Sequence, residues 1–190
     1  DRVLNLSEKY LRAGFAFGGS CLPKDVRALV YSAKQTDVHV PVLGSVLESN
    51  QRHIGRAIEM VEVAGNRRVG VIGLSFKAGT DDVRESPVVA LIETLVGRGY
   101  AVSVYDELVE LSRLIGENRA SLERELPHIA SLMRDTVEAV VDEAETVVVA
   151  NNGRNVSRAL DCIRPEQHVV DLVGLAADSR PTRTYDGICW

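Results

Sequence analysis

The 190-residue sequence lacks the features of several protein classes. Its three cysteines have no paired spacing, so neither a disulfide framework nor a zinc site is expected, and no other metal site is indicated. Acidic residues outnumber basic ones, 27 to 22, which argues against a nucleic-acid partner. The apolar runs are far shorter than a membrane span, and no signal peptide is recognisable at the start. We therefore expect a cytoplasmic chain without nucleic-acid or membrane partners.

The sequence does contain a clear change of hydrophobic pattern near residue 65. Apolar residues recur at three- and four-residue steps in 25–34 and 42–63, as in amphipathic helices, and the second helix is long enough for a subunit interface. Beyond that point strand and helix patterns alternate. Strands are predicted at 68–74, 101–105, 146–150 and 168–172, and helices at 86–96, 111–125, 136–143 and 156–162.

This alternation predicts a mostly parallel sheet that is covered on both faces and binds ligands at the carboxyl ends of its strands. We predict an α/β fold in which residues 1–64 form a helical central segment with a long helix, and residues 65–190 form a Rossmann-like parallel-sheet domain. The tail, residues 176–190, is expected to be irregular.

A glycine-rich loop ending at a cysteine precedes the first predicted helix. Cys21 lies where backbone N–H groups and the positive end of the helix dipole favour a thiolate, and Lys24 adds a positive charge. Gly18 and Gly19 would let the backbone approach a ligand closely. A lone cysteine in a tight turn is more often buried and inert, but this combination of neighbours favours a nucleophile.

Asp25 follows Cys21 by about one helical turn, so both side chains could face one pocket. Its carboxylate could orient or deprotonate a water that attacks an acyl group on the cysteine. An aspartate in a first turn also complements the helix dipole, and the spacing favours neither interpretation.

A second loop, residues 73–86, joins the first predicted strand to its helix, where nucleotides usually bind. It matches neither GxGxxG nor a P-loop. Lys77 and Arg84 could contact phosphate or sugar oxygens, or could be solvated charges. Asp106, after the second strand, could bind a ribose or serve as a turn or capping residue.

Two motifs together resemble the UDP-glucose/GDP-mannose dehydrogenase family, and especially its GDP-mannose branch. They are GFAFGGSCLPKDVRAL at residues 14–29 and GLSFKAGTDDVRES at residues 73–86. The resemblance covers essentially the whole chain but only the second half of such an enzyme. It implies that the chain begins within the central region, lacks the N-terminal NAD-binding half, and is inactive alone.

The resemblance also implies a chemistry: a four-electron, NAD-dependent oxidation of GDP-mannose to GDP-mannuronate, the alginate precursor. Cys21 would capture the intermediate aldehyde as a thiohemiacetal, and a second hydride transfer would leave a thioester. Asp25 would assist the hydrolysis of this thioester.

Further site residues are implied by the same resemblance, together with a homodimer formed through the long helix. Lys24 would lie near the nicotinamide, and Arg84 would approach the NAD pyrophosphate. The substrate would contact Tyr10, Arg12, Phe15, Gly18 and Lys77.

Two alternatives stay open. The shared catalytic motif also fits the oxidation of UDP-glucose or UDP-N-acetylmannosamine, because spacing does not reveal which base is bound. The chain could also be a non-catalytic module for nucleotide-sugar binding and dimerisation.

Overall fold

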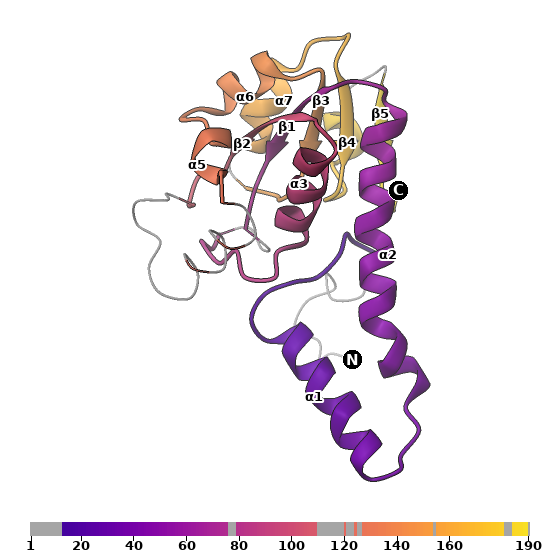
Figure 1. Cartoon of the computed structure of the whole chain (residues 1–190). Helices are drawn as coiled ribbons and strands as arrows, with labels where there is room; N and C mark the ends of the chain where they lie inside the picture. Colours follow the sequence, from indigo (N-terminus) through magenta and orange to yellow (C-terminus); the bar gives the residue numbers. More distant parts are fainter. Residues whose placement is uncertain are drawn as a thin grey trace.

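The structure is a computed structural model that describes residues 13–75, 79–109, 120, 124, 127–153, 155–180 and 184–189. It begins with a helical hairpin of α1 (Leu22–Gln35) and α2 (Pro41–Val63). Each helix has a proline in its first turn, where the missing N–H has no intrahelical partner to lose. The hairpin projects below a sheet-containing unit, and the C-terminal half of α2 runs along the side of that unit (Figure 1).

A five-stranded parallel sheet forms the rest of the fold, in the order β2-β1-β3-β4-β5. The strands are β1 (Arg68–Ile72), β2 (Ala101–Tyr105), β3 (Thr146–Val149), β4 (His168–Asp171) and β5 (Tyr185–Gly187). Among the described residues, the helices with defined bounds that follow α2 are α3 (Pro87–Gly97), α5 (Ile129–Leu132), α6 (Val137–Glu143) and α7 (Val156–Cys162), with a short 3-10 helix at Ala177–Ser179.

The predicted fold class is confirmed, because a helical segment with one long helix leads into a parallel sheet. The predicted irregular tail is wrong in part, since the 3-10 helix and β5 both lie within it. β5 has only three residues, which is too short to show an alternating pattern, and pairing with β4 defines it. The predicted helix at 111–125 lies almost entirely outside the described residues.

Helices cover both faces of the sheet, as the alternation predicted (Figure 1). The larger core cluster joins α2 and α3 to one face, and a second cluster joins α6 and α7 to the other. Gly70 in β1 has no room for a side chain, because an added Cβ would lie 2.8 Å from Val140 Cγ1 of α6. In α2 the buried side chains are Ile54, Ala57, Ile58 and Val61, all in its C-terminal half. The N-terminal half therefore extends beyond the core, and Asn50 in this half contacts the loop that ends at Cys21.

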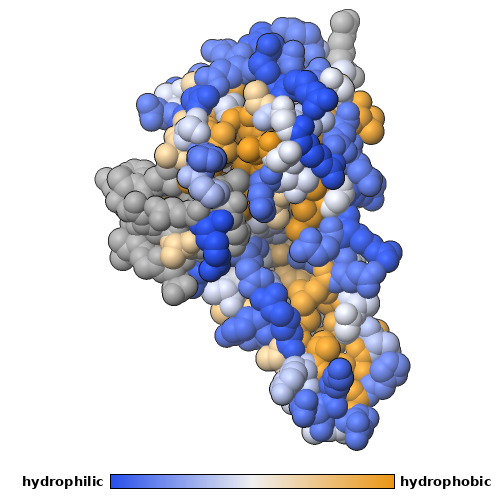
Figure 2. Space-filling view, viewed as in Figure 1, coloured by the Kyte–Doolittle hydropathy of each residue, from blue (hydrophilic) through white to orange (hydrophobic). Residues whose placement is uncertain are grey.

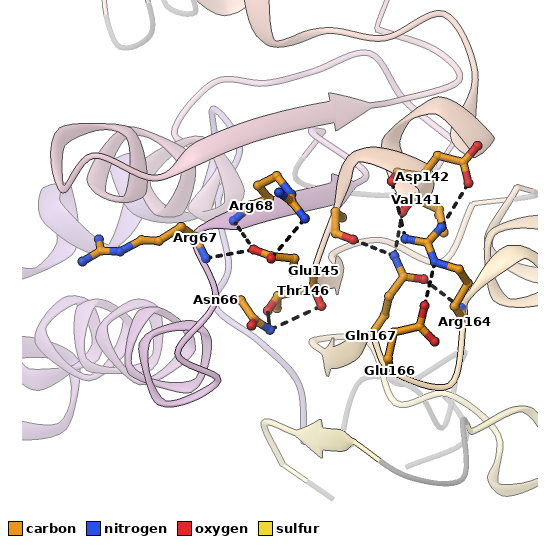
Figure 3. A network of polar contacts seen from close by, with 11 residues as sticks. Asn66, Arg67, Arg68, Val141, Asp142, Glu145, Thr146, Arg164, Glu166 and Gln167 are labelled. Atoms are coloured by element: carbon orange, nitrogen blue, oxygen red, sulfur yellow. Dashed lines mark hydrogen bonds and ion pairs between the residues drawn. The ribbon is translucent and has the colours of Figure 1, made fainter.

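A network of polar contacts lies at the amino ends of the strands (Figure 3). The carboxylate of Glu145 accepts hydrogen bonds from the backbone N–H groups of Arg67 and Arg68, at 3.3 and 3.2 Å. The side-chain amide of Gln167 donates to the carbonyl oxygens of Val141 and Ala144, both at 2.7 Å. These contacts pair several backbone groups at the amino ends of the strands, and in parallel sheets of this kind ligands bind at the opposite, carboxyl ends. Across the described ranges, no helix combines the length and apolarity needed to cross a membrane.

Candidate functional site

Cys21 lies where the sequence predicts, at the N-cap of α1 with its side chain exposed. The N–H of Asp25 donates to the carbonyl oxygen of Cys21 at 2.8 Å, which closes the first turn of the helix. Ser20 Oγ is 3.7 Å from the sulfur. An exposed sulfur at a helix N-terminus is accessible to a substrate and lies near the positive end of the helix dipole.

The charged pair that follows the cysteine is also exposed. Lys24 Nζ lies 3.4 Å from Asp25 Oδ1, and the two side chains are 66% and 59% exposed. An ion pair this open contributes little stability. Both groups are therefore available to a ligand, and their predicted roles in catalysis and cofactor binding stay predictions.

The cysteine loop lies on the loop that follows β1, so the two motifs meet in space. The N–H of Gly19 donates to the carbonyl oxygen of Arg84 at 3.0 Å. A Cβ at Gly18 would collide with the carbonyl oxygen of Glu85 and lie 2.8 Å from Pro87 Cδ. Gly18 is thus required for the packing of one loop on the other, a reason that differs from the predicted ligand contact, which stays a prediction.

The C-terminal segment also reaches this loop. Phe15 is partly buried against the larger core cluster, which also includes Ile188 and borders Cys189. The thiol of Cys189 donates to the carbonyl oxygen of Gly14 at 3.2 Å. The substrate contact predicted for Phe15 stays a prediction.

Arg84 is held by a neighbouring carboxylate in the second motif. Its Nε and Nη2 donate to the two carboxylate oxygens of Asp82, both at 2.8 Å. The guanidinium hydrogen bonds hold the pKa of Asp82 below its ordinary value, against a smaller opposing effect of burial. The Arg84 side chain is 39% exposed, so it is oriented and still accessible from outside.

This pair makes stability depend on pH. Because the pKa of Asp82 is lowered by folding, its stabilisation is present at neutral pH and lost as the pH falls through the lowered value, below about pH 3.8. We expect Asp82→Asn to reduce the free energy of unfolding by about 0.5–1 kcal/mol at pH 7, a range that allows for solvent screening. Urea unfolding from pH 7 to pH 3 should show this difference vanish in acid. Asp161→Asn, at an exposed aspartate, is the control, and an equal loss at pH 3 would contradict the assignment.

The structure favours one of the two interpretations of Asp106. Its Oδ2 accepts hydrogen bonds from the N–H groups of Leu74 at 2.7 Å and Ser75 at 3.1 Å. Its Oδ1 accepts from the N–H groups of Leu108 at 2.9 Å and Val109 at 3.2 Å. Only 9% of the residue is exposed. Asp106 is a turn residue that joins the loops after β1 and β2, because its oxygens are committed to the protein's own amides.

A small cavity lies at the carboxyl ends of β1, β2 and β3. It holds about 20 Å³ and is lined in part by Gly73, Tyr105 and Asn151. Burial raises the pKa of Tyr105, whose hydroxyl accepts a hydrogen bond from Asn155 at 3.0 Å. A cleft of about 230 Å³ lies behind the cysteine loop, between α1, α2 and the start of α3. Larger clefts of about 430 and 500 Å³ lie beside α7 and along β2 and include none of the predicted site residues.

Three predicted substrate residues, Tyr10, Arg12 and Lys77, lie outside the described residues. In the part of the chain that the structure describes, no group of histidine, cysteine and acidic side chains is arranged to hold a metal ion.

Sequence reasoning missed Asn50, whose side-chain amide binds the cysteine loop. A signal was present, since Asn50 precedes Ile54 and Ala57 by four and seven residues and so shares their apolar stripe. A polar side chain on such a stripe has to find a partner when the helix packs.

Two family profiles match the chain. The central domain of the UDP-glucose/GDP-mannose dehydrogenase family matches residues 2–52, and the UDP binding domain of the same family matches residues 70–176. Each match includes one of the two sequence motifs.

Curated relatives align along the whole chain. GDP-mannose 6-dehydrogenase of Pseudomonas putida is 47% identical over 194 residues, covering 100% of this chain and 44% of the relative. The enzyme of the same name from Azotobacter vinelandii is 42% identical, covering 100% and 43%. UDP-glucose 6-dehydrogenase TuaD of Bacillus subtilis is 34% identical over 118 residues, covering 59% and 26%. The chain thus spans about 44% of the length of the GDP-mannose relatives.

Solved structures have the same architecture. A ternary complex of GDP-mannose dehydrogenase from Pseudomonas aeruginosa superposes with a TM-score of 0.88 at 44% identity, covering 100% of this chain and 43% of that one. A UDP-glucose dehydrogenase from Pyrobaculum islandicum gives 0.75 at 28% identity, covering 94% and 39%. On its motifs, its fold and these relatives, the chain belongs to the UDP-glucose/GDP-mannose dehydrogenase family.

Proposed function

We propose that this chain supplies the nucleophilic cysteine and the sugar-nucleotide-binding half of an NAD-dependent GDP-mannose 6-dehydrogenase that makes GDP-mannuronate for alginate. The observation that carries the proposal is the packing of the Cys21 loop on the loop after β1, where Gly19 donates to the carbonyl oxygen of Arg84. This contact brings the proposed nucleophile to the loop that carries Arg84, whose cationic side chain is proposed to bind a ligand. Relatives named GDP-mannose 6-dehydrogenase at 42–47% identity favour this substrate.

Cys21 acts on the aldehyde formed by the first oxidation of the sugar alcohol. Its thiolate adds to the aldehyde carbon, and the oxygen takes a proton to give a thiohemiacetal. Loss of hydride from the same carbon and of the proton from its hydroxyl leaves a thioester. Water then attacks the thioester carbonyl, the C–S bond breaks, and the uronate and the free thiolate are released. The exposed sulfur at the N-terminus of α1 supports this role.

NAD, when bound, accepts the hydride of each oxidation. Neither motif of this chain contains a GxGxxG fingerprint. We therefore propose that the chain contributes to cofactor binding only through cationic side chains. Arg84 suits the pyrophosphate, because Asp82 holds its guanidinium in one orientation while leaving it partly exposed. Lys24 is 66% exposed beside Asp25 and suits a place near the nicotinamide.

The position of Asp25 on α1 supports a proposed role in the last step. The residue belongs to the first turn of the helix that Cys21 caps, and its side chain is 59% exposed. We propose that it orients the water that hydrolyses the thioester, a role that needs a carboxylate open to solvent.

The sugar nucleotide is assigned to the same loops. We propose contacts from Phe15 and Gly18, together with Tyr10, Arg12 and Lys77, on the strength of the shared family motifs. We retain the proposed division at residues 64 and 65, which falls between the end of α2 and the start of β1.

We also propose a cytoplasmic homodimer formed through the α1–α2 hairpin. Apolar side chains are exposed along it, and Figure 2 shows apolar surface there. The set comprises Leu22, Leu29, Tyr31, Val38, Val42 and Leu43. Light scattering of Val42→Asp should give a smaller mass than the unchanged chain.

The proposed cytoplasmic location rests on the cysteines, because three free cysteines suit a reducing compartment.

Calorimetry of this chain tests the substrate. We expect GDP-mannose and GDP to bind and UDP-glucose to bind at least about tenfold more weakly, because a site that hydrogen-bonds one base leaves polar groups unpaired with another. Tighter binding of UDP-glucose would favour a UDP-sugar dehydrogenase instead. Binding of GDP-mannose by a complete enzyme that forms no NADH would favour the non-catalytic module.

A further inference from the structure

We propose that Asn50 is a positioning residue for Cys21: its side chain fixes the backbone of the cysteine loop on α2 and so sets where the sulfur lies. The inference rests on the proposed role of Cys21. Asn50 touches no reacting atom in this arrangement and acts only through the loop.

The contact is a pair of hydrogen bonds to one residue. The N–H of Phe17 donates to Asn50 Oδ1 at 2.8 Å, and Asn50 Nδ2 donates to the carbonyl oxygen of Phe17, also at 2.8 Å. The amide thus pairs with both polar groups of a peptide backbone, as a neighbouring β-strand would. Both bonds are partly buried, so neither backbone group could lose its partner without cost.

The helix that carries Asn50 is rigidly placed. Ile54, one turn further along, is 6% exposed and belongs to the larger core cluster, and Ala57 and Val61 beyond it are fully buried. The position of the Asn50 amide is therefore set by the packing of α2 against α3 and the sheet. Phe17 is held to the core through this amide.

A second anchor lies between Phe17 and the cysteine. Gly19 donates its N–H to the carbonyl oxygen of Arg84, and Gly18 is confined beneath the carbonyl of Glu85. The loop is thus held at Phe17 by α2 and at Gly19 by the sheet-bearing unit, with Cys21 two residues later. Loss of the Asn50 anchor removes the side-chain hydrogen bonds that hold the loop on α2, and the path of the backbone between Phe17 and Cys21 is then less restricted.

A misplaced nucleophile and a merely weakened fold make different predictions. Geometric displacement of a catalytic group lowers kcat with little change in KM, whereas partial unfolding lowers the amount of active protein and the melting temperature. The substitution Asn50→Asp separates them. It keeps the size of the side chain and the acceptor for the Phe17 N–H, but turns the donor to the Phe17 carbonyl into a second acceptor.

The first experiment uses this chain alone and needs no turnover. Iodoacetamide labelling followed by peptide mass spectrometry measures the rate at Cys21, with Cys162 as an internal reference in α7. We expect Asn50→Asp and Asn50→Ala to change the labelling rate of Cys21 by about threefold, the scale of one surface electrostatic interaction, because the surroundings of the sulfur change, with the Cys162 rate unchanged. Gln51→Ala, at the next and exposed position, should leave both rates unchanged.

The second experiment uses the complete enzyme that contains this chain. We expect Asn50→Asp to lower kcat by about 10²-fold with KM changed less than about threefold. A normal kcat and a normal Cys21 labelling rate in Asn50→Asp would overturn the inference while leaving the proposed function intact. Normal uronate formation by Cys21→Ala would instead overturn the proposed function, whatever the behaviour of the Asn50 variants.

Discussion

Cys21→Ala in the complete enzyme is expected to lower uronate formation by at least about 10⁴-fold, the loss typical of a removed nucleophile. Without the sulfur neither the thiohemiacetal nor the thioester forms, so the aldehyde has no covalent route to the acid. The backbone around position 21 should be preserved, because the contacts of Cys21 within α1 use its carbonyl oxygen and its side chain is exposed. The effect should therefore appear in kcat and leave the melting temperature within about 1 °C.

Product analysis checks this prediction more directly than rate alone. Chromatography of the reaction mixture should show no uronate, while GDP-mannose binding by calorimetry is unchanged. Cys162→Ala is the matched control, since it removes a thiol that lies on α7 beside the second core cluster. Uronate at the normal rate from Cys21→Ala would show that the thioester mechanism is wrong.

Asp106→Ala is expected to lower the free energy of unfolding by about 3–4 kcal/mol, because it strips partners from several buried N–H groups at once. The lost acceptor serves Leu74, Ser75, Leu108 and Val109. For a chain of this length that change corresponds to a fall in melting temperature of about 6–16 °C. Calorimetric or circular-dichroism melting of the chain measures it.

Two further variants define the cause. Asp106→Asn keeps one acceptor oxygen and should lose about half as much stability, since its amide nitrogen cannot accept a hydrogen bond. Asp161→Ala, at an exposed aspartate, should change stability by less than about 0.5 kcal/mol. If Asp106→Ala had the same melting temperature as the unchanged chain, the carboxylate would not be joining the two loops, and the ribose-binding interpretation would be favoured.

Much of the fold could be predicted because it depends on local periodicity. α7 and β2 have the predicted bounds, and α2 begins one residue earlier than expected. β5 could not be predicted, because three residues carry too little pattern and the strand exists only through pairing with β4. A side-chain contact also joins β4 to β5, because the hydroxyl of Tyr185 donates a hydrogen bond to the carboxylate of Asp171 at 2.5 Å.

The candidate site was predicted unevenly. The exposed cysteine at a helix N-terminus follows from residues that are adjacent in the chain, so its position was readable. The role of Asp106 was not, because a buried turn aspartate and a ribose-binding aspartate have the same place after a strand. The partner of Arg84 was two residues away, yet spacing alone could not show that the Asp82 carboxylate accepts hydrogen bonds from both its Nε and its Nη2.

By itself the sequence determined most of the helices and strands and the position of the proposed nucleophile at the start of a helix, because these depend on side-chain type and short-range spacing. Only the tertiary structure decided how those parts meet. Asn50 lies 33 residues from Phe17, and Arg84 lies 65 residues from Gly19, yet both hold the loop that ends at Cys21. Such contacts are made when α2 and the sheet pack through their apolar faces, and the polar groups brought together must then be hydrogen-bonded.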